Sequence, residues 1–186
     1  MFVPFCSRGQ TWIHHNIPET KQHSKQWVSP GESVLKKAKV GLSANKVMAT
    51  IFWDAHGIIH IDYLQKGWKN NCEYYTNLLD WFSDDLKKKW PHLSKKKVVF
   101  HQDNARVHTC LVPMVKFYEL DYELLPYPPQ SPDLAPSDYL LFSNLKKWLS
   151  RKRLDSNDQI ISPTNTYFED LDKSYFLEGI KKLEKL

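Results

Sequence analysis

The sequence predicts an α/β domain with a mixed five-stranded sheet flanked by helices. Three strands come first, and helices and strands alternate after them. Strands joined by short turns pair antiparallel, whereas strands separated by helices pair in parallel, so this order indicates a mixed sheet. A length of 186 residues with 41% hydrophobic content suits one domain, spanning 1–186, with a sizeable core.

The first part of the chain supplies the three antiparallel strands. Residues 11–15 are expected to form the later part of a central strand whose start, before residue 9, the pattern does not fix. Residues 46–54 and 58–64 are two further strands joined by a hairpin turn. Residues 16–45 show no periodicity, and an irregular segment of that length is uncommon in a compact domain unless it has a function. A functional loop and a floppy insertion both remain possible.

The later elements alternate between helices and strands. Asn70 and Glu73 indicate a capping box for a helix that ends before Pro91. Beyond residue 153 the chain is helical again, with an interruption or restart at Pro163. Between these regions we expect a buried strand over 97–102, a helix over 109–120 and a fifth strand over 122–125.

Two aspartates lie at the ends of regular elements. Asp103 follows the strand over 97–102, and Asp138 opens a helix with apolar residues at helical spacing from Leu141 to Leu149. If both elements belong to one layer, the carboxylates face the same edge of the sheet. That arrangement suits a divalent metal and phosphodiester chemistry. A plain strand-end aspartate and a plain helix-start aspartate fit the residues equally well.

The motifs around these aspartates resemble the catalytic core of mariner-family transposases. The segments are HQDNARVH at 101–108 and SPDLAPSDYLLF at 131–142. The aspartates are separated by 138 − 103 − 1 = 34 residues, as are the last two acids of that family's triad. The resemblance extends from about Thr11 to the C-terminus, and the chain is also similar to the transposase half of SETMAR-type methyltransferase fusions.

The resemblance implies an RNase H-like fold and DNA strand cleavage and strand transfer that depend on Mg²⁺, with Mn²⁺ as a substitute. Asp103 and Asp138 then match two catalytic, metal-binding acids, while Gly9 stands at the position of the first and Gln10 beside it. Because glycine has no side-chain ligand, we expect defective cleavage and weakened metal binding. The alternative is a non-catalytic DNA-binding or dimerisation module, either domesticated or degenerate, and a product with no present role is a third possibility.

Nothing else in the sequence replaces the missing acid. Asp54 is expected in a hairpin turn and Glu19 beyond the strand, so neither carboxylate lies where residue 9 does. A Gly9→Asp substitution is therefore expected to restore a third ligand. Further departures from the family pattern, which indicate drift, are Arg106, Pro113, Gln130 and Pro163.

The basic residues predict a DNA partner. Lys+Arg of 26 against Asp+Glu of 21 gives a net charge of +5. By resemblance, residues 16–45 match a clamp loop that supports a homodimer when a preceding linker is present. We expect no N-terminal helix-turn-helix domains, no membrane partner, no small-molecule substrate and a nuclear location. The expected DNA-binding residues are Arg106, His108, Lys146, Lys147, Arg151, Lys152 and Arg153.

The cysteines and paired histidines predict no metal site of their own. Cys6, Cys72 and Cys110 are scattered without a CxxC pair, so neither zinc nor a disulfide framework is expected and the compartment should be reducing. Adjacent His14 and His15 point to opposite faces of a strand. No run of residues has the composition of a signal peptide or a membrane span.

Overall fold

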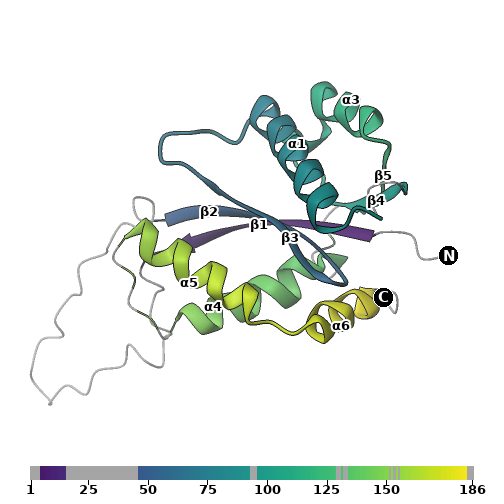
Figure 1. The fold of residues 1–186 in the computed structure, drawn as a ribbon. Coiled ribbons are helices and arrows are strands. Elements are labelled where there is room, and N and C mark those ends of the chain that lie inside the picture. The colour runs from purple at the N-terminus through teal and green to yellow at the C-terminus, as the bar shows by residue number, and fades with distance from the viewer. Residues whose placement is uncertain are drawn as a thin grey trace, which may run out of the picture.

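The computed structural model describes residues 5–15, 46–92, 96–128, 131, 134–150, 152, 154 and 156–183. Its centre is a five-stranded sheet in the order β3-β2-β1-β4-β5 (Figure 1). The first three strands pair antiparallel, and β4 and β5 join them in parallel, so the predicted mixed sheet is confirmed. The strands are β1 (Phe5–His14), β2 (Lys46–Asp54), β3 (Gly57–Leu64), β4 (Val98–His101) and β5 (Tyr122–Leu124).

Helices cover both faces of the sheet (Figure 1). On one face, α1 and α3 pack on a core that includes Phe52, Phe82 and Phe100. On the other face, η2 and α4 to α6 pack on a core around Trp53 and Leu141. The helices are α1 (Cys72–Lys89), α2 (Arg106–Thr109), α3 (Leu111–Glu119), the π-helix η2 (Ser137–Phe142), α4 (Ser143–Leu149), α5 (Asn157–Glu169) and α6 (Lys173–Leu183).

The central strand β1 begins at Phe5, within the segment where the sequence left its start open. Its side chains alternate between the two cores, because Cys6 contributes to the core under α1 while Ile13 contributes to the core under α4. This alternation places Arg8 and Gly9 on opposite faces of the sheet. The expected loop over 16–45 lies outside the described residues.

Three local predictions about helices were wrong. The N-cap of α1 is Asn71, whose side chain accepts a hydrogen bond from the Tyr74 backbone N–H, so the predicted cap lay one residue too early. The predicted helix over 109–120 is split at Cys110, and Pro113 falls in the first turn of α3, where a missing N–H is tolerated. Helix α5 begins after Ser156 and continues through Pro163, so the interruption or restart predicted at Pro163 does not occur.

A disulfide joins Cys72 to Cys110, which corrects the prediction from cysteine spacing. The two residues are 38 positions apart in the chain, but the fold brings the first residue of α1 beside the junction of α2 and α3. The spacing of the cysteines in the sequence does not reveal that these two residues lie close together in the fold. No helix among the described residues is both long and apolar enough to cross a membrane.

Candidate active site

The parallel pairing of β1 with β4 sets the position of Asp103. Ser7 lies opposite His101 in this pair. Continuing the same register places Gly9 beside Asp103, just beyond the last residue of β4. The sheet therefore puts the residue that the resemblance assigns to the first acid next to the second.

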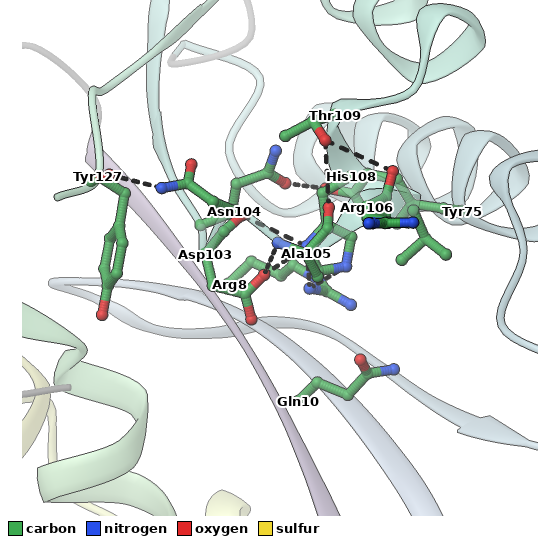
Figure 2. Close-up of polar contacts among 12 residues, drawn as sticks. Arg8, Gln10, Tyr75, Asp103, Asn104, Ala105, Arg106, His108, Thr109 and Tyr127 are labelled. Carbon is green, nitrogen blue, oxygen red and sulfur yellow. Dashed lines mark hydrogen bonds and ion pairs between the residues drawn. The ribbon is translucent and has the colours of Figure 1, made fainter. Parts of the chain in front are cut away.

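Asp103 is held by its own loop and by helix α2. Its Oδ1 accepts hydrogen bonds from His108 Nδ1 at 2.6 Å and from the Ala105 backbone N–H at 3.0 Å (Figure 2). Burial opposes ionisation of Asp103, but the hydrogen bonds from His108 and from the Ala105 N–H and the charge of Arg8 lower its pKa to about 2. Asp103 is therefore an anchored carboxylate at neutral pH, although its side chain is 54% exposed.

Asp138 lies in the first turn of η2, on the face of the sheet opposite α1. Burial raises its pKa, the neighbouring charge of Asp103 raises it further, and Lys146 opposes the shift. The charge of Asp103 thus acts on Asp138 across the edge of the sheet. Their surroundings shift the two pKa values in opposite directions.

The space beside Gly9 is filled. A Cβ atom at this position would overlap the Cβ of Ser137, and would lie 2.5 Å from Ser137 Oγ and 2.8 Å from Cε2 of Phe142. Ser137 Oγ in turn accepts a hydrogen bond of 2.9 Å from Nε1 of the buried Trp53. The helix that carries Asp138 therefore packs directly against the strand where the resemblance places a third carboxylate.

The residues present do not fit a two-metal site. Within the described part of the chain, no group of three or more His, Cys, Asp or Glu side chains is placed to hold a metal ion. The histidines His14, His15, His56 and His60 are therefore not part of any such group among the described residues. Asp54 instead accepts hydrogen bonds from the backbone N–H groups of His56 and Gly57 in the β2–β3 turn, as predicted for a turn residue.

The structure identifies two residues at this edge that the sequence analysis did not single out, Arg8 and Ser137. Arg8 is 5% exposed, and its Nη1 donates a hydrogen bond of 2.6 Å to Nε2 of His108. A charged residue inside the strand pattern of residues 5–14 was an available signal of a buried ion. Ser137 gave no such signal, because its role depends on how η2 packs on β1.

The predicted DNA-binding residues divide into three groups. His108 is fully buried, which corrects its assignment to DNA contact, since its ring is committed to Asp103 and Arg8. Arg151 and Arg153 lie outside the described residues. The remaining predicted residues have exposed side chains: Arg106, Lys146, Lys147 and Lys152.

A cleft of about 540 Å³ lies between β1 and α4, next to Asp138. Trp12, Asp138 and Lys146 are among its lining residues. The Trp12 side chain is 40% exposed, and the Nζ of Lys46 lies 3.9 Å from the centroid of the Trp12 ring. The cleft thus combines cationic and aromatic groups beside a carboxylate.

Comparison with known proteins extends these observations. The family model described as a transposase with a partial DDE domain matches residues 17–96. The chain is 32% identical over 176 residues to the mariner Mos1 transposase of Drosophila mauritiana, covering 94% of this chain and 50% of Mos1. It is 31% identical over 185 residues to the human histone-lysine N-methyltransferase SETMAR, covering 97% of this chain and 27% of SETMAR.

Solved structures of Mos1 share the fold. A Mos1 mariner paired-end complex with Mn has a TM-score of 0.85 and 30% identity, covering 97% of this chain and 52% of that one. A five-stranded mixed sheet with a carboxylate after β4 and another on the helix that follows β5 defines an RNase H-like transposase catalytic domain.

The chain belongs to the mariner transposase family and corresponds to its catalytic domain. It spans half of Mos1 and about a quarter of SETMAR.

Proposed function

We propose that this chain is a mariner-type catalytic domain that binds DNA through phosphate contacts but is deficient in metal-dependent strand cleavage and strand transfer. The observation that carries this proposal is the packing of Ser137 against Gly9. Gly9 has no carboxylate, and Ser137 occupies the space that a side chain at this position would need. Two-metal displacement at phosphorus needs ligands that hold two ions at a fixed spacing. Asp103 and Asp138 alone supply too few, so metal binding is weakened.

DNA binding is favoured by the exposed cations near the cleft. Lys146 lines the cleft beside Asp138, and its charge acts on that carboxylate. Lys147 and Lys152 are exposed along and just beyond the same helix. One Mos1 structure is a paired-end complex with the left transposon end, which supports DNA as the partner here. A nuclear location belongs to the same proposal.

Binding to duplex DNA across a salt series tests this part of the proposal. The variant Lys146→Glu with Lys147→Glu is expected to bind less tightly to every sequence. Its plot of log K against log salt should be shallower by about 2, because two phosphate contacts are lost. The matched control is Lys181→Glu with Lys182→Glu, which changes two exposed lysines of α6 by the same charge.

Three results would overturn this account of binding. One is sequence-selective binding, because it would require base readout. Another is an equal loss in both double variants, which would show that net charge alone matters. The third is undiminished binding by the Lys146→Glu and Lys147→Glu protein, which would place the DNA elsewhere.

The assembly state is part of the same proposal. By the family resemblance, residues 16–45 support a homodimer together with a linker that precedes the catalytic domain, so residues 1–186 tested alone are expected to be monomeric at micromolar concentration. Light scattering is the appropriate measurement, and a tight dimer would contradict this expectation.

A further inference from the structure

The side chain of Arg8 is a buried cation at the edge of the sheet that carries Asp103. It extends from β1 toward α1, where its Cζ lies 5.0 Å from the centroid of the Tyr75 ring. Its Nε and Nη2 have no hydrogen-bond partner among the described residues. Burying a guanidinium is costly unless an opposite charge compensates it, so a counter-ion must lie close by.

His108 links Arg8 to that counter-ion. A guanidinium only donates hydrogen bonds, so the bond of 2.6 Å from Arg8 Nη1 makes Nε2 of His108 an acceptor. The ring proton must then be on Nδ1, which donates to Asp103 Oδ1 at 2.6 Å. The result is a continuous chain from a positive group through a neutral imidazole to a negative group (Figure 2).

We propose that Arg8 supplies, from within the protein, the positive charge that balances Asp103, and that it does so in place of a divalent cation. The inference deepens the proposed function, because it adds electrostatic repulsion of metal ions to the missing ligand at Gly9. Arg8 and Gly9 lie on opposite faces of β1. The balancing of Asp103 by Arg8 therefore does not depend on the packing of Ser137 against Gly9.

With this arrangement, Asp103 and Asp138 make different contributions to the stability of the metal-free protein. In an empty metal site, carboxylates repel one another, and removing either one relieves the repulsion. If Arg8 is the counter-ion of Asp103, removing Asp103 instead leaves a buried guanidinium uncompensated. The sign of the change in stability therefore distinguishes the two arrangements.

Thermal unfolding in the presence of a chelator tests this sign with a matched pair of variants. Asp103→Asn is expected to lower the midpoint by about 2–5 °C, because a buried charge loses its partner. Asp138→Asn is expected to leave the midpoint unchanged or raise it, since burial disfavours that carboxylate. A raised midpoint for Asp103→Asn would overturn the proposal.

Titration with Mn²⁺ alone tests the effect on metal binding. Arg8→Met removes the charge but keeps a long side chain, and it is expected to tighten Mn²⁺ binding by roughly tenfold or more, because a cation beside a divalent ion repels it strongly in a partly buried site. Lys66→Met removes one charge from an exposed position and is expected to change nothing. Unchanged affinity in a folded Arg8→Met protein would overturn the proposal.

If Arg8→Met does not fold, thermal unfolding of Asp103→Asn and Asp138→Asn is sufficient to test the proposal. Neither measurement contains DNA. A failure here is therefore distinguishable from a failure of the proposed DNA binding, which is measured on other residues.

Discussion

The surroundings of Asp103 and those of Asp138 differ more than their positions at one edge of the sheet suggest. Asp103 is anchored by a histidine and a backbone N–H, and its pKa is lowered to about 2. Asp138 lies on the other side of the sheet, where burial raises its pKa and Lys146 only partly offsets this. One carboxylate is favoured as an ion by its surroundings, and the other is not.

The packing on the two faces of the sheet accounts for this difference. With Gly9 on β1, Ser137 and η2 pack closely against the strand. On the opposite face, Arg8 and His108 connect to Asp103. The ionised form of each acid is thus stabilised or destabilised by its own layer of the fold.

The largest effect is expected on the Asp138 side, from Gly9→Asp. The new side chain overlaps Ser137 and buries a charge, so it should destabilise the protein by about 4 kcal/mol or more in urea unfolding. This prediction replaces the simple repair expected from the sequence. Adding Ser137→Gly should recover part of the loss, because it removes the two closest overlapping atoms and leaves Trp53 Nε1 free to donate to the new carboxylate, while the Phe142 ring must still shift.

A Gly9→Asp protein as stable as the original would show that η2 moves away from β1 at little cost. In that case the close packing of Ser137 would not explain the state of the site. Ser137→Gly alone is the control for the loss of the bond to Trp53.

The next effect is expected on the Asp103 side, from Cys72→Ser. The disulfide joins α1 to the helices that follow Asp103 and closes a long loop, so its loss should cost about 2–4 kcal/mol of the free energy of unfolding. Urea unfolding with and without reductant measures this. The reductant should affect only the original protein, and an equal response of Cys72→Ser would contradict the assignment.

His108→Ala removes the bridge between Arg8 and Asp103. It should destabilise the protein by about 2 kcal/mol, because a buried guanidinium and a carboxylate each lose a hydrogen bond. His56→Ala is the matched control, since His56 also contacts an aspartate but is 41% exposed. Equal losses in the two variants would mean that the buried chain of hydrogen bonds contributes nothing special.

The pH dependence of stability should distinguish the two acids by a smaller amount. The folded pKa of Asp103 is lowered, so its stabilising contribution is complete above the unfolded pKa of about 3.9 and is lost as the pH falls through about 2. Because the side chain is half exposed, we expect only about 1 kcal/mol. The difference between the original protein and Asp103→Asn should therefore shrink as the pH is lowered from 5 toward 2.

Asp138 has the opposite sign in the same measurement. Its folded pKa is raised, so its ionisation opposes folding at neutral pH and this penalty disappears as it becomes protonated. Asp138→Asn should gain stability relative to the original protein as the pH rises from 3 to 6. A parallel response of both variants would refute the contrast between the two acids.

The sheet and its helices were predictable because their hydrophobic patterns are strong. The apolar residues Tyr75, Leu78 and Phe82 recur at helical spacing in α1 and are fully buried. The helix starts and interruptions were less predictable: Pro163 lies inside α5 because tertiary packing overrides the local preference of proline. Periodicity reports which face is buried, and it reports less about where an element begins.

The candidate site was predictable only in part. The sequence correctly placed Asp103 after a strand and Asp138 at the start of a helix, while the assignment of Gly9 to the position of a first acid rests on the resemblance alone. The contacts of Arg8, His108 and Ser137 join segments that are far apart in the chain, so no local pattern contains them. The pairing of Cys72 with Cys110 was missed for the same reason.

Nicking of supercoiled DNA with Mn²⁺ tests the central claim most directly. Three proteins are compared: the original, Gly9→Asp with Ser137→Gly, and that double variant with Asp103→Ala. We predict no nicking by the original beyond the background without protein, nicking by the double variant, and its loss in the third. Mn²⁺-dependent nicking by the original as strong as that of the double variant would contradict the account, because the site would then be complete without a carboxylate at position 9.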